Sequence, residues 1–215
     1  MKEIALASLG FFVLFLGIEA FTRRTNLSHE ISRKLAHILG GIGAAALPFF
    51  MTFNDIAILS GLFIAVMLIS KNKHIFRSIH DIKRSTYGEV YFPASICLTA
   101  LLFPDRPLYI FGVLVMAISD ALASIVGQAL GRRQYQLFRH KKSYAGSIAF
   151  AISTFVLCYT LGSHYFHSST SHLLLSSAYA AIALAAVEAC TSLGLDNLLI
   201  PPLAALVLSL LSNMN

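Results

Sequence analysis

Apolar runs separated by short polar stretches extend over the whole chain, and this pattern restricts the possible folds more than any other feature. The 215-residue chain is 57% hydrophobic and 12% charged, whereas a soluble domain is about 25% charged. A helix that crosses a bilayer needs about 20 largely apolar residues. We therefore predict an all-α, polytopic integral membrane bundle of about eight (seven or eight) transmembrane helices, which forms one domain over residues 1–215. The predicted spans are residues 4–21, 35–51, 56–70, 90–103, 108–130, 147–166, 173–190 and 198–211.

Positive charges alternate between the predicted loops. Most Lys and Arg residues, 14 of 16, lie in the loops that follow the first, third and fifth spans. They are Arg23, Arg24, Arg33 and Lys34; Lys71, Lys73, Arg77, Lys83 and Arg84; and Arg132, Arg133, Arg139, Lys141 and Lys142. Positive charge concentrates in cytoplasmic loops. We therefore predict that these loops face the cytoplasm, that both termini lie outside, and that the membrane is a bacterial inner membrane.

The net charge of +6 follows from this membrane topology, so we expect no binding to nucleic acid. The first run contains Glu19 and lacks a clear cleavage site, and we expect it to be a retained helix rather than a signal peptide. Residues 71–89 place isoleucines at helical spacing among Lys and Arg residues. This pattern is typical of a short amphipathic helix on the inner leaflet, although a plain cationic loop is an equally good interpretation.

Four groups of polar residues are candidates for chemistry, and the first opens the second span. Arg33, Lys34 and His37 are spaced three and four residues apart, so they share one face of a helix. Three potential cations at the membrane surface could bind a phosphate group. The alternative is a topology-setting flank followed by an ordinary buried histidine.

The second group centres on Asp120, a carboxylate within an apolar run. Ionisable residues at membrane depth are costly and commonly functional. Gly127 and Gly131 follow on the same helix and form a G-x-x-x-G pattern, which allows close helix packing or the approach of a ligand to the backbone. The alternative is a packing role for Asp120 in a pair with a basic residue.

The third group is the segment from Lys141 to Ser147, which leads from the basic loop into the sixth span. Its lysines and hydroxyls, together with a helix N-terminus, are suited to binding nucleotide phosphates. The residues concerned are Lys141, Lys142, Ser143, Gly146 and Ser147. A cationic loop with a capping serine is the alternative.

The fourth group consists of Glu188 near the inner end of the seventh span, followed by Asp196 and Asn197. Oxygen ligands of this kind suit Mg²⁺, whereas a turn and helix cap would also explain Asp196 and Asn197. Glu188 is an acid within an apolar helix, which favours a functional role. By the predicted topology all four groups meet at the cytoplasmic face, where nucleotide is available.

These groups together resemble one family, the membrane kinases that include dolichol kinase, phytol kinase and CTP-dependent diacylglycerol kinase. The resemblance covers residues from about 32 to 202 and has four parts. The motif R-K-x-x-H-x-x-x-G corresponds to Arg33, Lys34, His37 and Gly41, and the motif D-x-x-A-x-x-x-G-x-x-x-G corresponds to Asp120, Ala123, Gly127 and Gly131. The motif K-S-x-x-G-S corresponds to Lys142, Ser143, Gly146 and Ser147. The motif E…D-N-L-x-x-P corresponds to Glu188, Asp196, Asn197, Leu198 and Pro201.

The resemblance implies a kinase that transfers a phosphoryl group, typically from CTP, to the hydroxyl of a polyprenol, a phytol-type isoprenoid alcohol or diacylglycerol, with Mg²⁺ as cofactor. It implies that Lys141, Lys142, Ser143 and Ser147 bind the nucleotide phosphates, and that Asp120, Asp196 and Asn197 hold the metal. Asp120 or Glu188 would accept the alcohol proton. Arg33, Lys34 and His37 would stabilise transferred charge or bind the lipid phosphate.

Two alternatives remain open from the sequence. A phosphatidate cytidylyltransferase-like enzyme would also bring CTP and Mg²⁺ to a lipid, but it would release pyrophosphate instead of CDP. A non-catalytic membrane carrier would be expected to place ionisable residues near the midplane, often within an inverted repeat. The ionisable residues here gather at one predicted face, so the kinase is favoured.

Overall fold

The structure is a computed structural model that describes residues 1–25, 29–73, 88–137, 140–166, 169–191 and 194–212. Its helices are α1 (Lys2–Thr25), α2 (His29–Ala46), α3 (Phe53–Lys73), α5 (Gly88–Leu102), α6 (Arg106–Leu114), α7 (Ala121–Leu130), α8 (Tyr144–Tyr165), α9 (Thr170–Cys190) and α10 (Leu195–Ser212). A 3-10 helix, η1 (Leu47–Phe49), follows α2. Most of the predicted surface segment, residues 74–87, lies outside the described part of the chain, so neither interpretation of it is tested.

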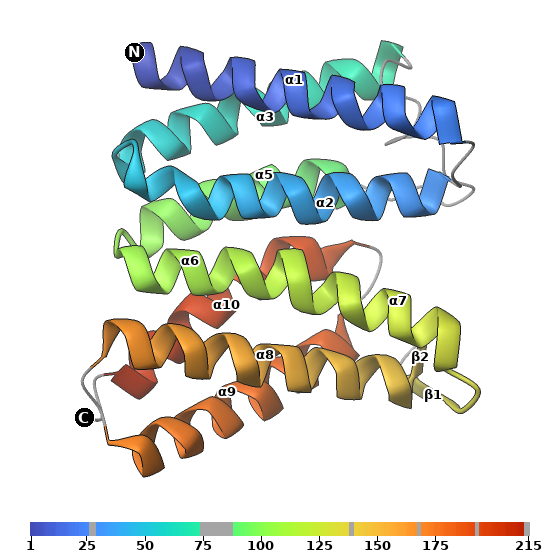
Figure 1. The fold of residues 1–215 in the computed structure, drawn as a ribbon, viewed down its shortest axis with the longest axis vertical. Coiled ribbons are helices and arrows are strands. Elements are labelled where there is room, and N and C mark those ends of the chain that lie inside the picture. Colours follow the sequence, from blue (N-terminus) through green and yellow to red (C-terminus); the bar gives the residue numbers. More distant parts are fainter. Residues whose placement is uncertain (26–28, 74–87, 138–139, 167–168, 192–193, 213–215) are drawn as a thin grey trace.

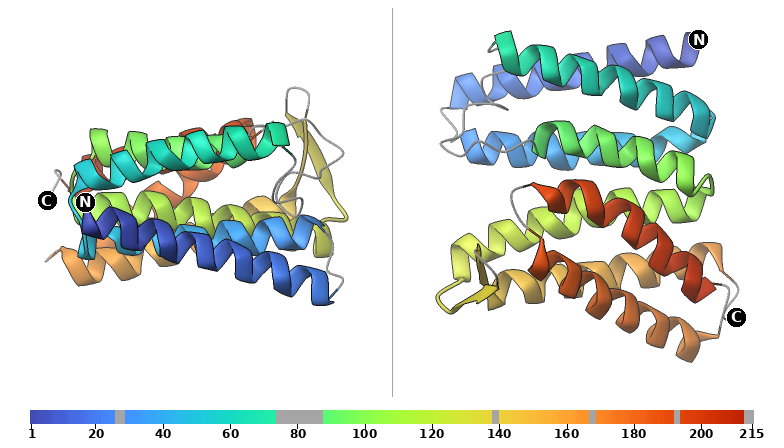
Figure 2. Two further views of the ribbon diagram at one scale, coloured as in Figure 1. Left: turned by 90° about the horizontal axis from the view of Figure 1, so that it is seen from above. Right: turned by 180° about the vertical axis from the view of Figure 1, so that it is seen from behind.

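The helices lie side by side in two layers (Figures 1 and 2). One layer contains α1, α2, the continuous α6–α7 segment and α8, and the other contains α3, α5, α10 and α9. The start of α1 and the end of α10 lie at one end of the bundle, and the turn after α7 lies at the opposite end (Figure 1). The start of α1 and the third basic loop therefore lie at opposite ends of the bundle, while the side of the membrane that each faces remains a prediction.

Apolar side chains cover both the interior and the outer surface of this bundle. Tyr109, Phe111 and Phe150 are completely buried between the layers. Leu9, Ile152 and Ile182 are among many large apolar residues that remain exposed on the outer helix faces. A soluble monomer rarely exposes large contiguous apolar surface, whereas lipid favours such a surface. The exposed apolar surface therefore supports a membrane-embedded bundle.

Five helical segments are long and apolar enough to cross a membrane: Lys2–Thr25, Arg106–Leu130, Tyr144–Tyr165, Thr170–Cys190 and Leu195–Ser212. Phe53–Ile69 and Val90–Leu102 are shorter apolar helices. Each predicted span coincides with a helix in the described residues, α2 included. The membrane-bundle class is therefore confirmed in outline, while the predicted count of seven or eight crossings remains a prediction.

The all-α prediction missed a small β-hairpin. Strands β1 (Gln134–Leu137) and β2 (His140–Ser143) pair antiparallel within the third basic loop, with Tyr135 opposite Lys142 and Gln136 opposite Lys141. Neighbouring residues of a strand point to opposite faces, so this hairpin separates the two lysines. The cationic composition of the loop concealed this short alternating pattern from sequence analysis.

The α6–α7 segment is interrupted by a π-helix, η2 (Val115–Asp120), which ends at the acid singled out from the sequence. The π-helix is rare and occurs mostly as single-turn insertions, often at functional sites. It lies where α2 packs closely against this segment, because a Cβ atom on Gly41 would overlap that of Ala117. Hydrophobic periodicity gives no indication of this feature.

Candidate functional site

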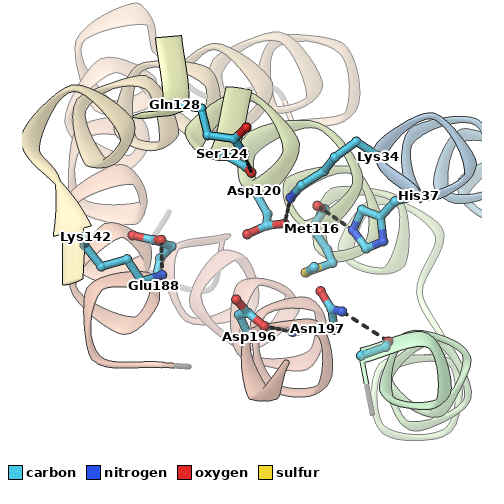
Figure 3. A network of polar contacts seen from close by, with 11 residues as sticks. Lys34, His37, Met116, Asp120, Ser124, Gln128, Lys142, Glu188, Asp196 and Asn197 are labelled. Atoms are coloured by element: carbon cyan, nitrogen blue, oxygen red, sulfur yellow. Dashed lines mark hydrogen bonds and ion pairs between the residues drawn. The ribbon is translucent and has the colours of Figure 1, made fainter. Parts of the chain in front are cut away.

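Polar side chains from α2, η2, β2, α9 and α10 converge at the end of the bundle that carries the hairpin (Figure 3). Acidic and basic residues gather there within an otherwise apolar protein. Burying a charge is favourable only when it is paired and hydrogen-bonded, so the partners of each side chain indicate how the site is held together.

The first pair joins Lys34 of α2 to Asp120 at the end of η2. The Lys34 Nζ atom donates to Asp120 Oδ2 at 3.2 Å. The two side chains are only 13% and 12% exposed, respectively. Asp120 begins α7 but makes no capping hydrogen bond to that helix. The carboxylate is therefore not needed to cap its own helix, and it faces the other polar side chains (Figure 3).

The second pair joins Lys142 of β2 to Glu188 of α9, with Lys142 Nζ donating to Glu188 Oε1. Their side chains are 19% and 5% exposed. Burial lowers the pKa of Lys142, but the facing carboxylate of Glu188 more than offsets this effect, and the net pKa is raised. A raised pKa keeps the lysine protonated to higher pH than usual, so Lys142 is a cation throughout the physiological range.

Glu188 also carries an unused acceptor. Its second oxygen, Oε2, is buried and has no hydrogen-bond partner among the described residues. An unsatisfied buried carboxylate oxygen costs free energy, and a bound ligand would supply the missing partner. Asp120 and Asp196 lie close enough to Glu188 to interact with it electrostatically.

Asp196 and Asn197 begin α10 and extend the site toward α5. The Asn197 side chain donates from Nδ2 to the carbonyl oxygen of Gly88 at 3.1 Å. The turn before α10 uses Gly194 at φ +88, a conformation that favours glycine. A Cβ atom on Gly194 would lie 3.0 Å from the Gly88 backbone. Two glycines thus bring the start of α5 against the start of α10 and fix Asn197.

A histidine of α2, His37, contacts the backbone of the π-helix. His37 Nε2 lies 3.3 Å from the carbonyl oxygen of Met116, and a carbonyl can only accept a hydrogen bond. Nε2 therefore carries a hydrogen, which leaves Nδ1 available as an acceptor in the neutral ring. The His37 ring packs against Phe92 of α5, with centroids 4.5 Å apart. The histidine connects η2 to the space between the two layers.

The glycine and serine motifs join α7 to α8. Ser143 caps α8 by accepting from the Gly146 amide at 3.0 Å. A Cβ atom on Gly127 would lie 2.8 Å from the Ser143 hydroxyl, and one on Gly131 would also meet Ser143. Ser147 shares a 2.6 Å hydrogen bond with the Tyr135 hydroxyl. These contacts hold the β1–β2 hairpin against α7 and α8, and they thereby fix the position of Lys142.

Gly146→Ala tests this packing. A Cβ atom at position 146 would lie 2.7 Å from the backbone oxygen of Ala123, and forced overlap of this kind costs about 1–3 kcal/mol. We expect a lower melting temperature in detergent and reduced activity, because the hairpin that carries Lys142 would be displaced. Gly61→Ala is the matched control, since a Cβ atom there would have no neighbour within 4 Å among the residues that the structure describes. Equal melting temperatures of the two variants would contradict the packing role.

Most of the sequence-predicted site residues meet in this region. Lys34, Asp120, Lys142, Glu188 and Asp196 form the charged cluster, which we call the acid–lysine cluster. His37, Arg33 and Asn197 border it on the side of a groove. Lys141 lies apart from the cluster. It is exposed, and because it neighbours Lys142 on β2, its side chain points to the opposite face of the strand.

The groove was not predicted from the sequence. It separates α1 and α2 from α3 and α5, and about 800 Å³ of empty space lies within it, its open side included. Arg33, His37 and Asn197 line its polar end, and apolar residues including Phe63 and Ile96 line the remainder. The Arg33 Nε atom is buried there without a hydrogen-bond partner in the described residues.

The donor atoms of the cluster suit Mg²⁺ bound together with a nucleotide. Within the described residues no three His, Cys, Asp or Glu side chains form a ready-made metal cage. Mg²⁺ commonly needs only one or two carboxylates when phosphates and water complete its coordination. Asp120 and Asp196 are two carboxylates of the cluster, and Glu188 Oε2, which has no hydrogen-bond partner among the described residues, is a further buried oxygen acceptor.

The chain is similar to proteins named as phytol kinases. It is 30% identical over 208 residues to the phytol kinase of Synechocystis sp., and the aligned region covers 95% of this chain and 89% of that protein. It is 26% identical to phytol kinase 1, chloroplastic, of Arabidopsis thaliana, over 76% of this chain and 58% of the plant protein. A probable phytol kinase of Triticum aestivum is 27% identical over 96% of this chain and 75% of its own length. No family model matches the chain, and no solved structure matches it.

Proposed function

We propose that this chain, which belongs to the phytol kinase family, transfers the terminal phosphoryl group of a nucleoside triphosphate to the hydroxyl of an isoprenoid alcohol at the acid–lysine cluster. The observation that carries the proposal is the position of this cluster at the polar end of an apolar groove. A lipid alcohol and a charged nucleotide need these two environments side by side. CTP is the expected donor, because the sequence motifs resemble those of CTP-dependent kinases.

Phosphoryl transfer depends mainly on positioning and charge neutralisation. Lys142 and Lys34 are the cations that would face the nucleotide phosphates, and both are held in place by a carboxylate. Bound phosphate would take over part of each lysine's pairing, since an ammonium group can donate three hydrogen bonds. Asp120 and Asp196 would hold the Mg²⁺ that travels with the nucleotide, and this ion would neutralise charge on the phosphates.

The hydroxyl of the alcohol would approach from the groove. His37 lines that groove, and its Nδ1 atom is available as an acceptor while Nε2 is fixed by Met116. Asp120 is a second candidate for the proton acceptor because it lies beside the same region (Figure 3). Arg33, whose Nε atom has no hydrogen-bond partner in the part of the chain that the structure describes, would bind the phosphate that the lipid acquires.

The position of the cluster also supports an orientation in the membrane. It lies beside the third basic loop, at the end of the bundle opposite the start of α1 and the end of α10. Cytoplasmic loops carry the excess of Lys and Arg. We propose a site on the cytoplasmic face of a bacterial inner membrane, with both termini outside.

Transfer of label from nucleotide to lipid tests this function. Purified protein in detergent would receive γ-labelled CTP or ATP with Mg²⁺ and either phytol, farnesol, a polyprenol or diacylglycerol. We expect organic-phase label with phytol-type alcohols and CTP, and its loss when EDTA removes the metal. The absence of label from every alcohol with both donors, from protein that retains its melting transition, would refute the kinase proposal.

A further inference from the structure

The groove between the two layers has a direction. Arg33, His37 and Asn197 lie at one end, Ala44 lies further along α2, and Leu47 begins η1 directly after it. From Arg33 to Ala46, the end of α2, the helix advances by about 20 Å at 1.5 Å per residue. Apart from Ser60, the described residues of α1, α3 and α5 that line the groove are apolar or glycine, so the charged and amide side chains are confined to the end beside the cluster.

The polar end is continuous with the acid–lysine cluster through two residues. Asn197 lines the groove and follows Asp196, and its side chain is held by the Gly88 carbonyl oxygen. His37 lines the groove and contacts Met116, four residues before Asp120.

We propose that this groove binds the isoprenoid chain of the substrate in one orientation, with the hydroxyl between His37 and Asn197 and the tail directed toward Ala44 and Leu47. The inference rests on the proposed function and adds where and how the substrate lies. A flexible apolar chain with a single terminal hydroxyl matches both the shape and the one-ended polarity of the groove. A chain of a few isoprene units fits its length, whereas a chain of tens of units would have to leave it for the bilayer.

Two sites on α2 allow a matched test. Ala44 lines the groove and is 2% exposed, whereas Ile42 is 46% exposed on the outer face of the same helix. Ala44→Phe would fill the far half of the groove, and Ile42→Phe would add the larger side chain to the lipid-facing side. We expect Ala44→Phe to raise KM for phytol about tenfold or more while changing KM for the shorter geraniol much less. Ile42→Phe should change neither value by more than about twofold.

Crosslinking of the wild-type protein provides a measurement that does not depend on activity. A phytol analogue with a diazirine at its tail would be photolysed with the protein, and the modified residues would be mapped by mass spectrometry. We expect labelling of groove residues such as Leu59 and Ile96, which unlabelled phytol should suppress.

The outcomes of these experiments distinguish binding of the lipid in the groove from phosphoryl transfer. Competable labelling in the groove supports the binding site, even if no phosphoryl transfer is found and the proposed function fails. Competable labelling on another surface overturns the groove while leaving kinase activity intact. A folded Ala44→Phe variant whose KM rises equally for phytol and geraniol would also overturn the proposed orientation.

Discussion

Asp120→Asn is expected to lower kcat by about 10²–10³-fold, the usual cost of removing one fixed charge-stabilising group from an active site. The substitution keeps the size of the side chain but removes the negative charge that faces Lys34 and the site. Because the proposed role is to hold the metal of the nucleotide complex or accept a proton, the loss should appear in kcat and in kcat/KM alike. Initial rates at saturating nucleotide and alcohol would measure it.

A structural explanation of that loss can be separated from a catalytic one. Removing one partner of a buried ion pair leaves the other charge unpaired and is strongly destabilising, so Asp120→Asn alone could act through Lys34. The double variant Lys34→Gln/Asp120→Asn removes both charges. We expect it to recover most of the melting temperature and none of the activity. Recovery of activity together with stability would show that Asp120 serves only to neutralise Lys34.

Lys142→Gln is expected to have the second largest effect. The buried carboxylate of Glu188 would lose its counter-charge, which costs about 3–5 kcal/mol in comparable buried pairs. Nucleotide binding should also weaken, because the substitution removes a cation proposed to face the phosphates. We expect KM for the nucleotide to rise at least about tenfold, since a charged hydrogen bond contributes about 1.5–3 kcal/mol. Nucleotide titrations at a fixed alcohol concentration would measure it.

Two comparisons make this result specific. The exchanged pair Lys142→Glu/Glu188→Lys retains opposite charges, so it should recover part of the lost melting temperature but not nucleotide binding. Lys141→Gln changes the neighbouring, exposed lysine on the other face of β2 and should alter KM by less than about threefold. If Lys141→Gln raised KM as much as Lys142→Gln, the hairpin would not orient one lysine toward the phosphates as proposed.

Hydrophobic runs and charge alternation were sufficient to predict the order of the helices. Each predicted span coincides with a helix, because apolar length and flanking charge are properties of the local sequence. The number of true crossings does not follow from the same information. α2 carries Arg33, Lys34 and His37 in its first half, so its helix formation and its position in the membrane are separate questions.

The composition of the site was likewise predictable, but its pairing was not. Isolated acids in apolar helices identified Asp120 and Glu188, and the basic loop identified Lys142. That Lys34 pairs with Asp120 and Lys142 with Glu188 depends on contacts between residues 86 and 46 positions apart in the chain. Spacing along one helix contains no information about such contacts.

Three features had no usable sequence signal. The π-helix at Val115–Asp120 begins with four apolar residues that resemble the helix before it, and its Ser119 and Asp120 do not indicate a change of helix type. The hairpin of β1 and β2 is only four residues long per strand and lies in a loop dominated by charge. The groove arises because α2 and α5 do not close upon each other, which is decided by packing across two layers. The residue pattern therefore predicted which charged residues gather in this region, but it did not predict the groove beside them.

The position of the transferred phosphorus tests the central proposal most directly. Parallel reactions with phytol would contain either α-labelled or γ-labelled CTP, and the lipid product would be separated from the nucleotide. A kinase places γ-label in the lipid and leaves α-label in CDP, and we expect this result. Label from the α-phosphate in the lipid, accompanied by pyrophosphate, would identify a nucleotidyl transfer and would contradict the proposed phosphoryl transfer.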